Sequence, residues 1–214
     1  MAEPQNHIVF IVDDDRRVRE SLSGLLSSFD MQTATFSCAA DYLAYPKPVD
    51  VPACLVLDLQ LPDINGLDLQ SQIAQGSFPP IVFITGHGDI PSSVRAIKAG
   101  AVDFLTKPYR QEDLMRAINA ALAQSRENQQ KGAELAELQR RLASLTPREG
   151  EVLPLIVSGL LNKQAAAELG ISEVTLQIHR SNVMKKMGAD SFAELVRKAL
   201  VLAVPVTRSR HSRR

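Results

Sequence analysis

The first half of the chain alternates short apolar runs with amphipathic stretches. Residues 7–12 form an apolar run that stops at three consecutive aspartates, and further apolar runs occupy 31–36, 53–57, 80–84 and 101–105. Helical patterns fit after the first run and near 38–45, 65–75 and 91–99, and another begins near 111. Five strands that alternate with five helices predict a parallel sheet wrapped on both faces. The nearly continuous apolar runs fit strands that are buried from both sides.

The rest of the chain is helical in pattern. Residues 111–145 predict one long helix, or two in series, with a leucine seam of heptad spacing just after Gly132. The leucines of this seam are Leu135, Leu138, Leu142 and Leu145. The seam covers about one and a half heptads, too few for a stable coiled coil alone. It therefore either pairs between two subunits or packs on its own domain.

Four short helices are expected between residues 145 and 202. Thr146 has the form of an N-cap, with Pro147 at the first helical position and Glu149 at the third. The helices are expected from Pro147 to about Ser158, from after Asn162 (a suitable cap) to Gly170, from Ser172 to Met187, and over about 191–202. The predicted organisation is a first domain at 1–123, a helical linker at 124–144, an all-α four-helix domain at 145–204, and a basic, disordered tail at 205–214.

The net charge is zero, but its distribution along the chain is uneven. Residues 1–123 carry nine Lys or Arg against fifteen Asp or Glu, whereas residues 145–214 carry eleven against six. An acidic first domain suits cation or phosphoryl chemistry, and a basic second domain suits a polyanionic partner. No apolar run approaches the roughly 18 residues of a membrane span, and no signal peptide is recognisable. Cys38 and Cys54 lie in apolar settings, so we expect free thiols and a cytoplasmic protein.

Polar side chains follow four of the predicted strands. Asp13 and Asp14 follow the first strand, Asp58 ends the third, Thr85 ends the fourth and Lys107 follows the fifth. Open α/β sheets place their ligand crevice at these carboxyl ends. Three carboxylates in one crevice repel each other, and Mg²⁺, a hard cation with oxygen ligands, removes that conflict. If one carboxylate is a nucleophile toward phosphorus, the metal, the lysine cation and the threonine hydroxyl supply the remaining catalytic parts.

These residues lie in segments that resemble the receiver domain of response regulators. The matching segments are Ile-Val-Asp13-Asp14-Asp15, Leu-Val-Leu-Asp58-Leu-Gln-Leu-Pro-Asp-Ile-Asn-Gly66, Ile-Thr85-Gly-His-Gly-Asp and Ala-Val-Asp-Phe104-Leu-Thr-Lys107-Pro108. The resemblance covers about residues 7–123. It implies a flavodoxin-like (βα)5 domain in which a sensor histidine kinase phosphorylates Asp58.

The same resemblance implies a set of metal ligands. Asp14, Asp58 and the backbone carbonyl of Gln60 are expected to bind Mg²⁺ directly, and Asp13 is expected to act mainly through water.

The resemblance further implies a switch made by Thr85 and Phe104. The Thr85 hydroxyl turns toward the phosphoryl group, the aromatic ring follows inward, and the face of the fourth helix, fifth strand and fifth helix changes its arrangement. The peptide bond before Pro108 is expected to be cis.

The basic domain contains a pattern typical of a helix-turn-helix. The short turn 169–172 joins the second and third helices. The outward face of the third helix mixes polar and apolar residues, which suits base edges in the major groove of double-stranded DNA. The candidate DNA-binding residues are Lys163, Val174, Thr175, Gln177, Ile178, Arg180, Ser181, Lys185 and Lys186.

The segments Leu145-Thr-Pro-Arg-Glu-Gly-Glu-Val-Leu, Gly159-Leu-Leu-Asn-Lys-Gln-Ala-Ala and Leu169-Gly-Ile-Ser-Glu-Val-Thr-Leu-Gln-Ile-His-Arg-Ser-Asn look like a LuxR-type helix-turn-helix domain. With the receiver, this order is similar to NarL/FixJ-type regulators, especially their FixJ-like branch. The resemblance implies control of transcription rather than enzymatic turnover. It also implies a homodimer after phosphorylation, and such a regulator can contact RNA polymerase.

Two positions depart from the LuxR-type pattern. Gln177 stands where a lysine is usual, which predicts either a shallower salt dependence of DNA binding or a base contact through the amide. Pro154 lies inside the first helix of this domain, where proline costs about 3 kcal/mol unless a kink is accommodated.

Two other functions fit parts of the pattern. Aspartyl-phosphate phosphatases also combine an Asp nucleophile with Mg²⁺, but they carry a second Asp at the position of Gln60. A phospho-dependent adaptor would bind protein through the helical domain, and its binding would lack the steep salt dependence of DNA binding. His87, beside the acidic residues, is interpreted as an exposed loop residue.

Overall fold

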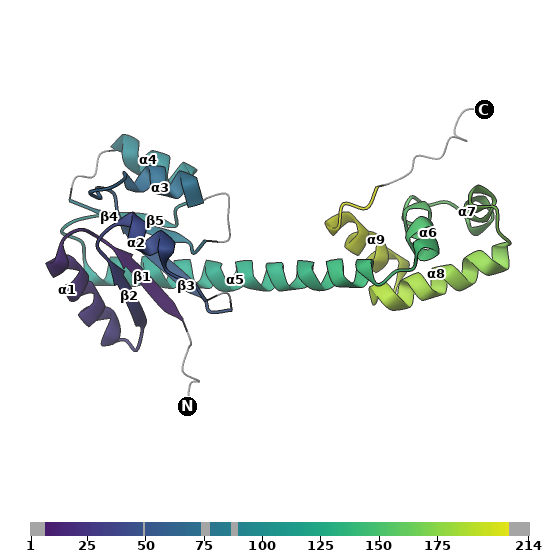
Figure 1. Cartoon of the computed structure of the whole chain (residues 1–214), viewed down its shortest axis with the longest axis horizontal. Coiled ribbons are helices and arrows are strands. Elements are labelled where there is room, and N and C mark those ends of the chain that lie inside the picture. The colour runs from purple at the N-terminus through teal and green to yellow at the C-terminus, as the bar shows by residue number, and fades with distance from the viewer. Residues whose placement is uncertain (1–6, 49, 74–77, 87–89, 206–214) are drawn as a thin grey trace. The chain divides into compact units, whose positions relative to one another are not determined.

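The computed structural model describes residues 7–48, 50–73, 78–86 and 90–205 (Figure 1). His87 and residues 206–214 of the predicted tail lie outside these ranges. The chain forms two compact units, Met1–Gln129 and Gln130–Arg214. In the described residues no helix is long and apolar enough to cross a membrane.

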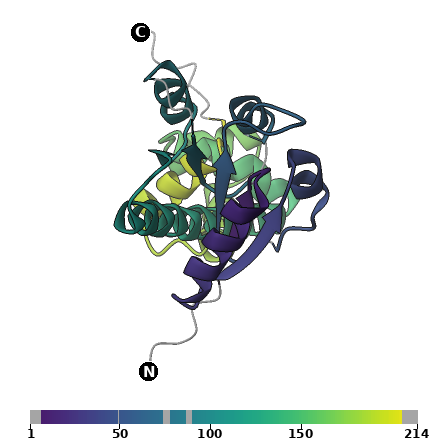
Figure 2. The same ribbon diagram turned by 90° about the vertical axis from the view of Figure 1, so that its left-hand side faces the viewer.

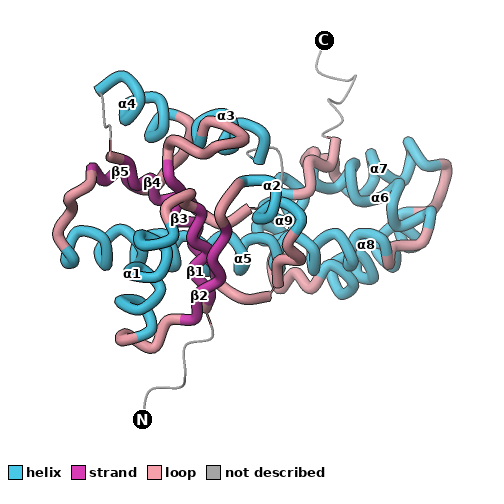
Figure 3. Tube along the Cα trace, turned by 60° about the vertical axis from the view of Figure 1, so that its left-hand side comes forward, coloured by secondary structure: helices cyan, strands magenta, loops and turns pink. Residues whose placement is uncertain are grey.

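The first unit is built around five parallel strands in the order β2-β1-β3-β4-β5, which is the flavodoxin-like order (Figure 3). The strands are β1 Ile8–Val12, β2 Gln32–Phe36, β3 Ala53–Asp58, β4 Ile81–Thr85 and β5 Asp103–Thr106. The helices are α1 Arg16–Ser27, α2 Ala39–Ala44, α3 Gly66–Ile73, α4 Ile90–Lys98 and α5 Gln111–Ala143. The predicted alternation of five strands and five helices is confirmed.

The sheet separates two apolar cores, and alternate residues of each strand face one or the other. Val9 and Ile11 pack with α1 and α5, whereas Phe10 and Val12 pack with α2, α3 and α4. Figure 2 shows the strands with helices on both sides. Burial from both sides explains why β3 and β4 are apolar at nearly every position.

The segment predicted as one helix or two in series is a single helix, α5. The border between the two units falls within it, between Gln129 and Gln130. Near the end of its first part, the buried Ser125 hydroxyl accepts a hydrogen bond of 3.0 Å from the N–H of Ala53, the first residue of β3. Leu142 packs on the core of the second unit, so at this position the leucine seam contacts its own domain.

The second unit consists of the last part of α5 followed by α6 Pro147–Val157, α7 Asn162–Leu169, α8 Glu173–Met187 and α9 Phe192–Val201. Its core includes Val152, Ile156, Leu176, Val183 and Leu195, which are all fully or nearly fully buried. These contacts gather the four predicted helices around one apolar centre.

The helix ends of this unit follow the sequence signals with one exception. Thr146 and Glu149 form the predicted capping box of α6, and Ser172 caps α8. Asn162, predicted to cap α7, is instead its first helical residue. The backbone of Leu161 occupies the cap position, and the Gln164 side chain accepts its N–H at 2.9 Å. Asn162 is thereby released to bond elsewhere.

Pro154 lies inside α6 as predicted. The Pro154 carbonyl still accepts the Ser158 N–H at 3.2 Å, so the helix continues through the proline to its end.

Candidate functional site

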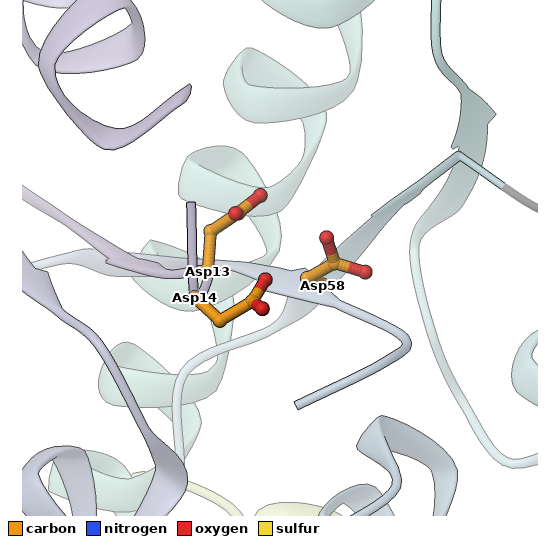
Figure 4. A group of neighbouring side chains, drawn as sticks. All are labelled: Asp13, Asp14 and Asp58. Carbon is orange, nitrogen blue, oxygen red and sulfur yellow. The ribbon is translucent and has the colours of Figure 1, made fainter. Parts of the chain in front are cut away.

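Three carboxylates meet at the carboxyl ends of the central strands. Asp13 and Asp14 follow β1 and Asp58 ends β3, and Figure 4 shows their side chains close to one another. Each offers an oxygen, and these oxygens all lie within 4.8 Å of one another. Asp13 and Asp58 are buried, whereas Asp14 is exposed. The parallel pairing of β1 with β3 brings together residues that are 44 or 45 positions apart in sequence.

Lys107 neutralises part of this negative charge. Its Nζ donates hydrogen bonds to Asp13 Oδ2 at 2.6 Å and to Asp58 Oδ2 at 2.7 Å. Burial disfavours the charged form of Lys107, but the two carboxylates outweigh burial and raise its pKa. Burial also raises the pKa of the Asp13 carboxyl, and the hydrogen bonds from Lys107 and the Asp15 N–H only partly oppose it. Among the described residues, the Lys107 ammonium therefore pairs with two of the three carboxylates.

This donor set fits a hard divalent cation. Mg²⁺ prefers oxygen ligands and is usually held by one or two carboxylates together with water and phosphate oxygens. A cation would relieve the repulsion that remains after Lys107 has paired with two of the three carboxylates.

The loop after Asp58 is held by hydrogen bonds from backbone N–H groups and by a close contact. The Gln60 N–H donates to Asp58 Oδ1 at 3.0 Å, and the Gly66 N–H donates to the Leu59 carbonyl at 2.8 Å. A Cβ atom on Gly66 would lie only 2.6 Å from the carbonyl oxygen of Asp58. Gly66 is thus a glycine because the backbone that carries Asp58 passes against it.

Arg19, like Gly66, has a role that the sequence did not reveal. Its Nη1 donates to the backbone carbonyls of Asp13 and Asp14, at 2.7 and 2.9 Å. Asp15 caps α1 by accepting the Arg17 N–H at 2.8 Å. The turn that presents the first two aspartates is therefore fixed from the helix that follows it. An arginine one turn into that helix is the signal in the sequence.

Thr85 and Phe104 lie on neighbouring strands. The register pairs Phe83 with Phe104 and Thr85 with Thr106, so the two side chains belong to the same face of the sheet. Thr85 is buried, and its carbonyl accepts the Lys107 N–H at 2.7 Å. The ring centroids of Phe83 and Phe104 are 6.0 Å apart. The peptide bond between Lys107 and Pro108 is cis, which confirms that prediction.

The second unit contains a helix-turn-helix formed by α7 and α8. Gly170 ends α7 in the left-handed conformation, with φ of 65°, and Ser172 caps α8 two residues later. The left-handed conformation has little steric cost for glycine, and it allows a short turn. Arg148 of α6 donates from Nη2 to the Leu169 carbonyl at 2.6 Å and so caps the last turn of α7. The end of α7 is thereby held by a third helix.

The predicted DNA-binding residues fall into two groups. Those that are exposed are Lys163, Val174, Gln177, Ile178, Ser181 and Lys185, whereas Thr175, Arg180 and Lys186 are half-buried. The Thr175 hydroxyl shares a 2.8 Å hydrogen bond with the Ser172 hydroxyl at the start of α8. Lys163 lies on α7, and the other exposed residues lie on the side of α8 opposite the buried Leu176 and Val183.

Arg180 and Lys186 bond within the domain. Arg180 Nη1 donates to Asn162 Oδ1 at 2.9 Å, and its guanidinium lies 5.1 Å from the ring centroid of Phe192. Lys186 Nζ donates to Glu149 Oε2 at 2.6 Å and to the Ser144 carbonyl at 3.2 Å. The pairing with Lys186 and the capping bond from Thr146 lower the pKa of Glu149 to about 2.

Two family models match the chain. Residues 9–119 match the response regulator receiver domain, and residues 143–199 match the bacterial regulatory proteins of the luxR family. The chain is a response regulator. Nodulation protein W of Bradyrhizobium diazoefficiens is 46% identical to it over 198 residues, covering 92% of this chain and 87% of the relative.

Solved structures of response regulators are similar to this one over nearly the whole chain. The structure of StyR has a TM-score of 0.78 and 45% identity, covering 91% of this response regulator and 98% of StyR. Full-length FixJ from B. japonicum has a TM-score of 0.53 and 36% identity, covering 93% and 98%.

A receiver domain followed by a LuxR-type domain makes this response regulator a two-component regulator of transcription, whose partners are a histidine kinase and DNA. Receiver domains bind Mg²⁺ at an acidic pocket, which in this response regulator is the cluster of Asp13, Asp14 and Asp58.

Proposed function

We propose that Asp58 is the phosphoacceptor and that its phosphorylation controls dimerisation and DNA binding. The observation that carries the proposal is the buried Asp58 carboxylate with Lys107 Nζ at 2.7 Å and two further aspartates beside it. The arrangement supplies a nucleophile, a cation and an acidic metal site within one crevice.

In the proposed reaction an oxygen of Asp58 attacks the phosphorus of a phosphohistidine on the kinase. A phosphorus–oxygen bond forms, the phosphorus–nitrogen bond breaks, and the imidazole leaves as the neutral group because its other ring nitrogen already carries a proton. Asp14, Asp58 and the Gln60 carbonyl would hold Mg²⁺, with Asp13 acting through water, and the bound ion would supply positive charge for the phosphoryl oxygens. Lys107 supplies the second cation, and the Thr85 hydroxyl donates a hydrogen bond to the product.

The switch step follows from the neighbouring strands. When Thr85 turns toward the phosphoryl group it leaves space on the face of the sheet where Phe104 lies, and the ring moves inward.

Helix α4 packs on that face through the buried Ala96 and exposes Ile90, Val94 and Ile97. Val94 is four positions after Ile90 and three before Ile97, so the three side chains form one aliphatic stripe on the helix surface. We assign this stripe to the interface of the phosphorylated homodimer.

DNA binding is assigned to the helix-turn-helix, with α8 in the major groove. Lys163 and Lys185 are exposed and suit phosphate contacts, as do Arg180 and Lys186 if they exchange their intradomain partners for phosphate. The exposed residues Val174, Gln177, Ile178 and Ser181, with Thr175 beside them, face the bases. Contact with RNA polymerase would follow DNA binding.

Phosphorylation of the full-length chain by acetyl phosphate and Mg²⁺, followed on a phosphate-affinity gel, tests the input step. Asp58→Asn should remain unmodified. Asp68→Asn is the matched control, because Asp68 is an exposed carboxylate in the first turn of α3. Modification of Asp58→Asn at the wild-type rate would remove Asp58 from its assigned role.

Sedimentation with and without beryllofluoride and Mg²⁺ tests the output. The wild-type chain should dimerise and bind duplex DNA more tightly with the phosphoryl mimic, and its binding should weaken steeply with salt. Val94→Asp should stay monomeric while Asp58 is still modified. A dimer that persists in Val94→Asp would move the interface away from α4.

A further inference from the structure

The exposed surface at the start of α8 has an unusual composition for a DNA-facing helix. Among residues Glu173–Arg180, all of them described, the exposed side chains are one carboxylate, one amide and two aliphatic groups. Val174 and Ile178 are 68% and 57% exposed, although both are large and apolar. Val174, Gln177 and Ile178 are three and four residues apart and therefore adjoin on the helix surface. We call these three residues the aliphatic–amide patch.

No exposed lysine or arginine lies beside this patch in the first two turns of α8. His179 in these turns is half-buried, and Arg180 is held by Asn162 at 2.9 Å and packs on the ring of Phe192. The next exposed cation on the helix, Lys185, lies about 10 Å beyond Ile178 along the axis, at a rise of 1.5 Å per residue. A guanidinium or ammonium, the group that reads guanine most often, is thus missing from the described base-facing turns.

The chemistry of the patch matches one kind of base pair. In the major groove, thymine presents a methyl group that packs on aliphatic side chains, and adenine presents N6 and N7, which pair with a glutamine amide. An A·T pair presents both features side by side. The remaining exposed group, Glu173, occupies the first helical position, where the helix dipole favours a carboxylate.

We propose that the aliphatic–amide patch makes this response regulator a reader of A·T base pairs. Val174 and Ile178 pack against thymine methyl groups, and the Gln177 amide hydrogen-bonds with the adenine of the same or the adjoining pair. The inference rests on the proposed function, because it requires α8 to enter the major groove. Lys163 and Lys185 bind phosphates and carry no sequence information.

The first experiment selects duplexes from a randomised pool with the full-length chain and beryllofluoride. The enriched sequences should share a half-site in which A·T pairs are fixed at neighbouring positions. The best duplex is then rebuilt with deoxyuridine for thymine, which removes only the methyl group, or with 7-deazaadenine for adenine, which removes only the N7 acceptor.

Each substitution should weaken wild-type binding at the fixed positions. Loss of one packed methyl should cost about fourfold in affinity, the equivalent of about 0.8 kcal/mol. Loss of adenine N7 should cost about fivefold or more, since a bidentate amide–adenine pair contributes about 1–3 kcal/mol. Val174→Ala or Ile178→Ala should abolish one methyl effect, and Gln177→Ala should abolish the N7 effect.

Lys185→Ala is the matched control, since Lys185 lies on the same exposed side of α8. It should weaken binding to every duplex alike, reduce the salt dependence, and leave both base effects intact.

The outcomes separate the inference from the proposed function. The reading of A·T pairs is overturned if the selected duplexes share G·C pairs, or if neither base substitution changes the affinity. In both cases tight binding to the duplexes would still support DNA binding. Failure to enrich any duplex, with no salt-dependent binding, overturns both.

Discussion

Gly66→Ala tests how closely the phosphoacceptor strand is packed. The added Cβ would lie 2.6 Å from the Asp58 carbonyl oxygen, 3.0 Å from Cε1 of Phe83 and 3.1 Å from Cα of Leu59. Ordinary contacts begin at 3.4 Å, so the distance from Cβ to the Asp58 carbonyl would have to grow from 2.6 Å by about 0.8 Å. Two of the three neighbours are backbone atoms, which cannot rotate away as a flexible side chain can.

The size of the effect follows from that displacement. Forcing an extra methyl into a packed site costs typically about 1–3 kcal/mol of folding free energy. A misplacement of about 1 Å at a reacting group can slow a reaction about 100-fold. We therefore expect Gly66→Ala to lose about 1–3 kcal/mol of stability and to be phosphorylated roughly 10- to 100-fold more slowly.

The assay combines urea unfolding with a time course of acetyl phosphate labelling in the presence of Mg²⁺. Gly24→Ala is the control, because a Cβ at Gly24 of α1 meets nothing within 4 Å. It should gain roughly 0.5–1 kcal/mol from helix propensity and keep the wild-type labelling rate. Wild-type stability and labelling in Gly66→Ala would refute the argument that this contact positions Asp58.

Three further changes test contacts that join distant parts of one unit. Ser125→Ala leaves the Ala53 N–H without its hydrogen bond and should cost about 1–3 kcal/mol in urea unfolding. Glu149 has its pKa lowered from 4.5 to about 2 by Lys186, so the stability from this pair should be present above about pH 4.5 and lost as the pH falls toward 2, as thermal melts will report. Arg148→Ala removes the cap of α7 and should cost about 1 kcal/mol of thermal stability and weaken DNA binding at all sequences.

Each of these has a matched control. Ser71→Ala removes a hydroxyl from an exposed residue of α3 and should change stability by less than about 0.5 kcal/mol. Glu149→Gln should flatten the acid loss of stability, whereas the exposed Glu151→Gln should retain it. Arg197→Ala, an exposed position of α9, should leave thermal stability near the wild-type value. An equal response of variant and control would contradict the corresponding contact.

The sequence by itself determined the elements and the kind of chemistry. Nearly continuous apolar runs, followed at once by Asp13, Asp58, Thr85 and Lys107, specify a parallel sheet with polar groups at one edge. The capping signals of α6 and α8 are local, because the cap and the bonded N–H are three residues apart. Such features depend on near neighbours in the chain, so a linear pattern contains them.

Only the tertiary structure decided which side chains have hydrogen-bond or packing partners and which are left exposed. Lys107 and Asp13 are 94 positions apart, and the closeness of Gly66 to the Asp58 carbonyl depends on how a loop folds back on a strand. The sequence pattern makes Arg180 a candidate DNA-binding residue. In the structure its guanidinium bonds to Asn162, the residue that the sequence predicted as the cap of α7. A pattern of periodicity gives the direction of a side chain but not its partner, because the partner is selected by packing between elements that are distant in the chain.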